Sequence, residues 1–217
     1  MDYTPEFVER GYNNRAAVPD HPLWFARYAQ WSAAAFDRYR PARDVRYGPG
    51  PKEVLDVFAP AGTPRGTLLF LHGGYWRALD KDDFAFVAAP FVDAGIAVAN
   101  VNYDLCPAVS IAAIVDECRR AVAWTAREGA AHGAAANGIV VAGHSAGGHL
   151  AAMMLATDWA AHGFARAPLH AAVTLSGVHD LTPLVHFSFN ADFKLDAAQA
   201  AQLSPVGLTV EAPVPLL

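Results

Sequence analysis

Five consecutive residues, Gly143-His144-Ser145-Ala146-Gly147, form a G-x-S-x-G pattern. The residues before it, 139 to 142, favour a buried strand, and those from Ser145 to Thr157 favour a helix. A sharp strand-to-helix turn lifts a serine hydroxyl above the end of a sheet, and only small flanking residues fit such a turn. The pattern predicts Ser145 as a nucleophile, with the Ala146 amide and the positive helix end facing a developing oxyanion. A chance Gly-Ser-Gly loop is the competing interpretation.

A second glycine motif, His72-Gly73-Gly74-Tyr75-Trp76, follows the apolar run Thr67 to Leu71. A continuous apolar run suits a central strand that is covered on both faces. Paired glycines let the backbone approach a ligand closely. We therefore expect the amides of Gly73 and Gly74, with that of Tyr75, to point at a carbonyl oxygen of a substrate. A simple glycine turn is the alternative, but the order of the two motifs in one chain favours the functional interpretation.

Strand-like and helix-like segments alternate along the chain, which predicts an α/β fold with a mostly parallel sheet and helices on both faces. We expect a single domain over residues 1–217, in which residues 1–50 form an N-terminal helical cap. The expected strands are Glu53–Phe58, Thr67–Leu71, Ile96–Val101, Ile139–Ala142 and Ala171–Leu175, and the expected helices are Leu23–Arg40, Asp82–Ala94, Ser110–Glu128, Ser145–Thr157 and Asp196–Leu203.

The composition excludes several classes of protein. Hydrophobic residues make up 53% of the chain and charged residues 17%, and the net charge of -5 gives no electrostatic reason to bind nucleic acid or an anionic membrane. Cys106 and Cys118 match no zinc or redox spacing, and no signal peptide or bilayer-spanning run is visible. We expect a reduced, cytoplasmic protein that acts on a small molecule without a metal or an organic cofactor.

Taken together, the two motifs resemble those of the arylformamidase (kynurenine formamidase) family within the α/β-hydrolase superfamily. The loop His72–Trp76, with tryptophan in place of a third glycine, is typical of that family. Other stretches are also similar, and they cover essentially the whole chain: Tyr12-Asn13-Asn14-Arg15, Asn102-Tyr103 with Pro107, residues 143–149, residues 176–181 and Leu203-Ser204-Pro205.

This resemblance implies an esterase-like serine hydrolase of tryptophan catabolism, which cleaves N-formylkynurenine, related arylformamides or aryl esters. Ser145 would form the acyl-enzyme, and Gly73, Gly74, Tyr75 and Ala146 would make the oxyanion hole. A general carboxylesterase is a second hypothesis. A third is a non-catalytic remnant that binds a small ligand or a partner.

In this fold and family the catalytic acid and histidine follow the nucleophile in the chain. Residues 212–217 resemble the approach to one further core strand, and the acid and histidine are expected only after that point. We therefore expect the C-terminal strands to be missing and the 217-residue chain to be impaired as a catalyst. An unpaired sheet edge would also favour association, for instance as a homodimer.

Few residues within the chain could replace the missing catalytic acid and histidine. Histidines 72, 144 and 149 are expected to shape loops or pack, whereas a relay of Asp180 with His179 or His186 is the alternative. The residues Trp76, His144 and Phe187 are candidates for the substrate pocket, together with Tyr75 and Phe189. Core or lid packing is the competing interpretation for each aromatic residue.

Overall fold

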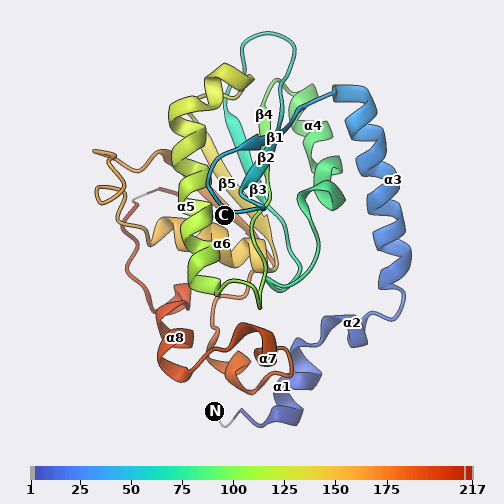
Figure 1. The fold of residues 1–217 in the computed structure, drawn as a ribbon, viewed down its shortest axis with the longest axis vertical. Coiled ribbons are helices and arrows are strands. Elements are labelled where there is room, and N and C mark those ends of the chain that lie inside the picture. Colours follow the sequence, from blue (N-terminus) through green and yellow to red (C-terminus); the bar gives the residue numbers. More distant parts are fainter. Residues whose placement is uncertain (1–2, 213, 217) are drawn as a thin grey trace.

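The structure, a computed structural model, describes residues 3–212 and 214–216. A six-stranded sheet with the order β1-β2-β4-β3-β5-β6 forms its centre (Figure 1). β2 pairs antiparallel with β1 and β4, whereas the pairs β3–β4, β3–β5 and β5–β6 are parallel. The expected mostly parallel sheet is confirmed. Its strands are β1 (Ala42–Arg46), β2 (Val54–Phe58), β3 (Thr67–Leu71), β4 (Ala97–Val101), β5 (Ile139–His144) and β6 (Leu169–Leu175).

Helices cover both faces of this sheet (Figure 1). α5 and α6 lie on one face, while α3 and α4 lie on the other, and the smaller helices gather at one end of the molecule. The α-helices are α1 (Pro5–Tyr12), α2 (Asn14–Ala17), α3 (His21–Tyr39), α4 (Ala88–Asp93), α5 (Ile111–Glu128), α6 (Ala146–Leu155), α7 (Asn190–Phe193) and α8 (Ala197–Gln202).

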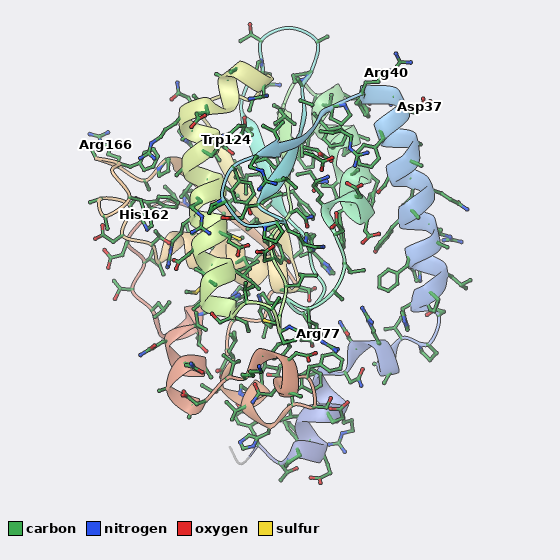
Figure 2. The ribbon with its side chains drawn as sticks, viewed as in Figure 1. Asp37, Arg40, Arg77, Trp124, His162 and Arg166 are labelled. Atoms are coloured by element: carbon green, nitrogen blue, oxygen red, sulfur yellow. The ribbon has the colours of Figure 1, made fainter. Side chains whose placement is uncertain are left out.

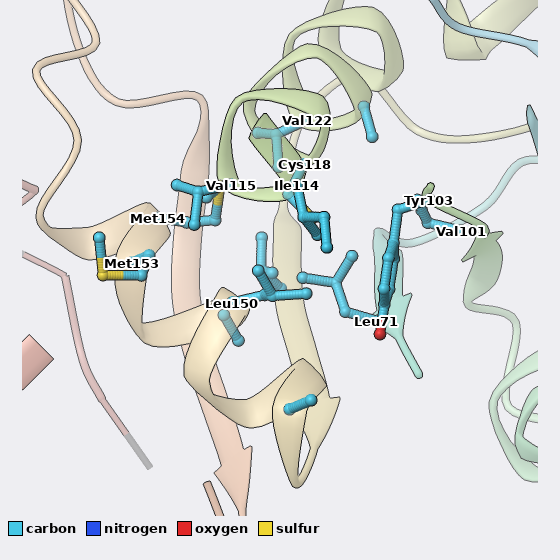
Figure 3. Packing of buried hydrophobic residues seen from close by; sticks show 14 of the residues in the cluster. Leu71, Val101, Tyr103, Ile114, Val115, Cys118, Val122, Leu150, Met153 and Met154 are labelled. Atoms are coloured by element: carbon cyan, nitrogen blue, oxygen red, sulfur yellow. The ribbon is translucent and has the colours of Figure 1, made fainter. Parts of the chain in front are cut away.

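The larger apolar core lies between the sheet and the helix pair α5 and α6 (Figure 3). Leu71 and Val101 from β3 and β4 meet Ile114 of α5 and Leu150 of α6 there, and all four side chains are fully buried. A second core packs Phe70 and other residues of the opposite sheet face beneath α4 and the aromatic side of α3. β3 and β4 are buried along their whole length because both faces are covered, as their continuous apolar runs predict.

Local signals explain where several helices begin. The Ser110 hydroxyl accepts a hydrogen bond from the amide of Ala113, so Ser110 caps α5 as expected. Asp196 and Gln199 form a capping box at the start of α8.

The expected helix over residues 82–94 is divided into two parts. Lys81–Val87 is a 3₁₀-helix, and only Ala88–Asp93 is α-helical. The Lys81 side chain is buried and its Nζ lies 3.0 Å from Oδ2 of the buried Asp56 on β2. This ion pair holds the first turn close to the sheet, which accounts for the tighter winding.

The strand order brings the two glycine motifs together. β3 lies between β4 and β5, and Leu71 is paired with Gly143. Because parallel strands end at the same edge, the loop after β3 and the loop after β5 must be neighbours there.

Near the end of the described residues, Leu216 forms a single parallel bridge with Ala172 of β6. The predicted strand approach also includes Pro213 and Leu217, which lie outside the described residues. Cys106 and Cys118 are both buried and free. Among the residues described, no helix combines the length and the apolar character needed to cross a bilayer.

Leu150 tests the larger core. We expect Leu150→Ala to lower the free energy of unfolding by about 2–5 kcal/mol, because a fully buried side chain is lost and leaves a cavity. Leu23→Ala is the matched control, since Leu23 is 66% exposed, and its effect should stay within about 0.5 kcal/mol. Urea unfolding followed by circular dichroism measures both variants. Equal losses of unfolding free energy in Leu150→Ala and Leu23→Ala would contradict the assignment of Leu150 to the core.

Candidate active site

The backbone at Ser145 has the geometry of a sharp turn between strand and helix. β5 ends at His144, α6 begins at Ala146, and Ser145 between them has φ 56° and ψ -116°. A non-glycine residue rarely adopts a positive φ, because the Cβ then crowds the backbone. The Ser145 amide donates to the carbonyl of Leu175 on β6 at 2.8 Å, which holds the turn against the next strand. Strain that is held in this way is common at functional sites.

The Ser145 hydroxyl is available for chemistry. Serine is a favoured N-cap residue, yet here its side chain makes no capping bond to α6. Ser145 is half-buried, and its hydroxyl has no hydrogen-bond partner among the described residues. The oxygen therefore lies at the start of α6 without being used to hold the helix.

The glycines around Ser145 are required by close backbone contacts. A Cβ on Gly143 would lie 2.1 Å from the carbonyl oxygen of Gly147, and a Cβ on Gly147 would lie 1.9 Å from the carbonyl oxygen of Leu71. A Cβ on Gly148 would lie 2.9 Å from the Cα of Gly177. These contacts are with backbone, which cannot move aside cheaply, so α6 can approach β3 only because glycines stand here.

The loop after β3 lies directly beside Ser145. A Cβ added to Gly73 would be 3.4 Å from the Cβ of Ser145 and 3.0 Å from the carbonyl oxygen of His144. Gly74 has φ 117°, and the non-glycine residues Tyr75 and Trp76 have φ 52° and 53°. Three successive residues with positive φ turn the loop back on itself, so that it stays next to Ser145.

Backbone amides of this loop are free. In the described part of the chain, the amides of Gly73, Gly74 and Tyr75 donate to no protein acceptor. The Ala146 amide is in the first turn of α6, where helical amides have no partner within the helix. Free amides on both sides of a serine form the arrangement that stabilises an oxyanion. The structure thus brings together the residues predicted for this role.

The side chain of His72 supports the loop after β3. Its imidazole stacks on the ring of Tyr103 at 4.2 Å between centroids, and its Nδ1 lies 2.7 Å from the carbonyl oxygen of Gly73. Because a carbonyl oxygen can only accept, Nδ1 is the donor. Complete burial lowers the pKa of His72 to about 4, so the ring is neutral at pH 7. The Tyr103 hydroxyl donates to the carbonyl of His72 at 2.6 Å.

The side chain of Tyr75 connects the loop to the N-terminal segment. Its hydroxyl donates to the carbonyl oxygen of Tyr12 at 2.6 Å, and burial raises its pKa to about 12. Its ring also packs against Phe187 and Phe189, each 5.6 Å away between centroids. Residue 75 therefore offers its amide to the site while its side chain fixes α1 in place.

A cavity of about 310 Å³ opens at Ser145. Six aromatic residues, two arginines and two histidines are among the residues that line it, and the glycine loop and Ser145 form one wall. The lining residues are Asn14, Arg15, Val18, His21, Trp24, Phe25, Tyr28, Gly73, Gly74, Tyr75, Arg77, Ala78, Leu79, Phe84, His144, Ser145 and Phe189. Its size is that of a small-molecule site.

Two of the predicted pocket residues do not line this cavity. Trp76 is fully buried and Phe187 is 3% exposed, because both pack into the larger core behind the cavity wall. The other residues predicted for the pocket, Tyr75, His144 and Phe189, do line the cavity. A second, larger cavity of about 630 Å³ lies against the apolar sheet face below α3 and includes His144 but not Ser145. We therefore place the candidate site in the smaller cavity.

Apart from His144, the histidines considered as substitute bases do not line the cavity. His149 is buried, its Nε2 lies 2.8 Å from the carbonyl oxygen of Leu203, and burial lowers its pKa to about 4. His179, Asp180 and His186 are also absent from the cavity wall. Asp180 accepts hydrogen bonds from both the amide and the hydroxyl of Thr182.

Sequence reasoning missed the contribution of the N-terminal segment. Residues 14–28 supply much of the cavity wall, including Arg15 and His21. The available signal was the stretch Tyr12-Asn13-Asn14-Arg15. Nothing in its periodicity relates it to Ser145, which follows it by more than a hundred positions. Among the described residues, no group of three or more His, Cys, Asp or Glu side chains could hold a metal ion.

Comparisons with known proteins identify the family to which this chain is similar. The BD-FAE family model matches residues 55–202. Kynurenine formamidase from Salmo salar is 36% identical over 172 residues, which are 75% of this chain and 54% of that protein. Kynurenine formamidase from Danio rerio is 35% identical with the same coverage. The chain thus spans about half the length of these curated relatives.

Solved structures are also similar. A protein from Silicibacter sp. TM1040, proposed to be a thioesterase, superposes with a TM-score of 0.84 at 35% identity, over 96% of this chain and 79% of that one. Esterase 2 of Thermogutta terrifontis has a TM-score of 0.65 at 21% identity, over 81% and 69%. The second likeness shows the fold alone.

Gly147 tests the close contact of α6 with β3. Gly147→Ala should lower the free energy of unfolding by about 1–3 kcal/mol, because its Cβ would meet the carbonyl oxygens of Leu71 and His72. Gly207→Ala, where a Cβ meets nothing within 4 Å, is the matched control and should change little. Chemical unfolding measures both. If the two variants unfold at the same denaturant concentration, the contact is not restrictive.

The burial of His149 predicts a pH dependence of stability. Its folded pKa of about 4 lies below the unfolded value, so the unfolded chain binds the extra proton and stability falls as the pH drops from 6.5 to 4. His149 alone should account for a loss of about 3 kcal/mol. In His149→Gln this contribution to the change of the free energy of unfolding with pH should disappear. The exposed control, His170→Gln, should keep it. Urea unfolding at several pH values measures the slope, and an unchanged slope in His149→Gln would contradict the prediction.

Proposed function

This chain belongs to the BD-FAE family of α/β-hydrolases, and we propose that it carries the nucleophile of a serine hydrolase of the kynurenine formamidase type. One observation carries this proposal: Ser145, held at φ 56°, lies beside the loop Gly73–Tyr75 at the wall of an aromatic cavity, and the amides of that loop have no protein acceptor among the described residues. The kynurenine formamidases of two fishes are its curated relatives at 35–36% identity.

The reaction would proceed in two steps. The Ser145 oxygen attacks the formyl carbon of an arylformamide, and the resulting oxyanion receives hydrogen bonds from the amides of Gly74, Tyr75 and Ala146. The C–N bond then breaks, and the aromatic amine leaves with a proton while the formyl group stays on the serine. Water attacks this ester, formate leaves, and the serine recovers its proton.

A base must carry these protons, because a serine hydroxyl is a weak nucleophile by itself. We propose that an acid and a histidine from a more C-terminal part of the fold complete the site. The chain order of the fold supports this proposal, as does the greater length of the relatives. The cavity histidines His21 and His144 are the candidates within the chain if this proposal fails.

The aromatic wall supports an aryl substrate. Trp24, Phe25, Tyr28, Tyr75, Phe84 and Phe189 surround the cavity and offer ring faces and edges to a planar group. An aryl ester would fit the same wall and use the same nucleophile and oxyanion amides. A carboxylesterase activity is therefore the second candidate, and the family match and the esterase fold neighbours support it.

The test compares three proteins: the 217-residue chain, a version extended with a C-terminus of the family, and the extended version with Ser145→Ala. Hydrolysis of N-formylkynurenine and of p-nitrophenyl acetate is followed by absorbance. We expect the extended version to be active and Ser145→Ala to lower kcat by about 10⁴- to 10⁶-fold. The 217-residue chain should be slower than the extended version by several orders of magnitude.

Other results would be equally informative. Activity that persists in Ser145→Ala would contradict the role of this serine. Full activity of the 217-residue chain, lost in Ser145→Ala, would place the base within the chain and make His21 and His144 the next variants. Cleavage of the ester without the formamide would favour the carboxylesterase.

A further inference from the structure

The wall of the Ser145 cavity has an uneven charge. Its ionisable residues include Arg15, Arg77, His21 and His144, whereas none of the described residues that line it is an aspartate or a glutamate. A cavity with cationic groups and no carboxylates favours an anionic ligand. The chain as a whole has a net charge of -5, so this local excess is not a property of the whole surface.

The two arginines differ in their surroundings. The Nε of Arg77 lies 2.5 Å from Oδ2 of Asp192, an ion pair in which the N–H is not well aligned for a hydrogen bond. Its guanidinium carbon lies 4.2 Å from the ring centroid of Phe189. The positive charge of Arg77 is therefore compensated by Asp192 of α7. Figure 2 labels Arg77 in the part of the molecule where the smaller helices gather.

The charge of Arg15 has no such compensation. Its residue is exposed, and within residues 3–212 and 214–216 no carboxylate forms an ion pair with it. Its guanidinium carbon lies 5.8 Å from the ring centroid of Phe25, another lining residue. Arg15 thus presents an unpaired guanidinium to the cavity beside an aromatic ring.

The segment that carries Arg15 is fixed relative to the reaction centre. Asn13 caps α2 by accepting from the amide of Ala16, and its side chain donates to Glu9 at 2.7 Å. The carbonyl of Tyr12 accepts a hydrogen bond from the hydroxyl of Tyr75, which lines the same cavity as Ser145. Only three positions separate Tyr12 from Arg15, so the chain connects this guanidinium closely to the loop that contains Tyr75. Figure 1 shows α1 and α2 at the same end of the molecule as α7.

From this arrangement we propose that Arg15 binds a carboxylate of the substrate, so that the site is selective for aryl formamides or esters that carry an anionic group. The proposal rests on the function proposed above. The planar fork of a guanidinium matches a carboxylate through two parallel hydrogen bonds. The aromatic ring of the substrate lies between the cavity rings, and its reacting carbonyl reaches Ser145.

A binding experiment tests this without requiring turnover. Isothermal titration of the 217-residue chain is carried out with 2-formamidobenzoate and with its methyl ester, which differ only in the carboxylate charge and the methyl group. Arg15→Ala should weaken binding of the anion by about 10- to 100-fold, as expected for a charge-assisted hydrogen bond. Arg15→Ala should change the affinity for the ester by no more than about twofold from that of the parent chain. Arg15→Lys should retain part of the preference for the anion.

Arg10 provides the matched control. It is an exposed arginine on α1, stacked over Phe7 at 6.0 Å, without a carboxylate partner among the described residues, and it does not line the cavity. Arg10→Ala should bind the anion as the parent chain does. Added salt should weaken binding of the anion to the parent chain more than binding of the anion to Arg15→Ala. Unfolding midpoints of all variants confirm that they are folded.

The outcomes separate this inference from the proposed function. Equal affinity for anion and ester, or an equal effect of Arg15→Ala and Arg10→Ala, overturns the role of Arg15. Absence of binding of either ligand overturns it too. The proposed hydrolase is judged separately, by Ser145-dependent cleavage of the uncharged p-nitrophenyl acetate in the extended version, and it can stand when the role of Arg15 does not.

Discussion

The parallel pairing of β3 with β5 is the constraint on which the candidate site depends. Leu71 lies opposite Gly143, so the glycine loop and the serine turn leave the sheet at neighbouring points of one edge. α6 then passes so close to β3 that only a glycine at position 147 avoids the carbonyl oxygen of Leu71. Ser145 and the free amides of the loop after β3 are therefore positioned by main-chain contacts, which vary little as side chains move.

This arrangement stores strain, and the surrounding structure holds it. Ser145, Tyr75 and Trp76 all have positive φ, which costs on the order of 1–3 kcal/mol for each residue. The bond from the Ser145 amide to β6, the stack of His72 on Tyr103 and the burial of Trp76 oppose their relaxation. The buried ring of His72 stays neutral because burial lowers its pKa to about 4, so it stacks and donates without adding a charge next to the free amides of the loop after β3.

Much of the framework could be predicted from the sequence, because its signals are local. The apolar run of β3 has the predicted bounds, and Ser110 caps α5 as expected. The 3₁₀-helix over residues 81–87 was missed, since it depends on an ion pair with Asp56 from another strand. At the site, both glycine motifs could be found, but an aromatic residue near a motif does not show which way it points. Trp76 and Phe187 turn into the core, whereas Phe189 faces the cavity.

The site thus combines two parts with different physical origins. The chemistry that we propose depends on backbone geometry at the carboxyl ends of parallel strands, where α/β folds commonly bind ligands. The cavity wall comes largely from residues 14–28, which precede the first strand and reach the site through side-chain contacts such as the one between Tyr75 and Tyr12. No main-chain pairing joins this segment to the sheet. On the proposals made above, the reaction would depend on the backbone near Ser145, and the choice of substrate would depend on side chains such as that of Arg15.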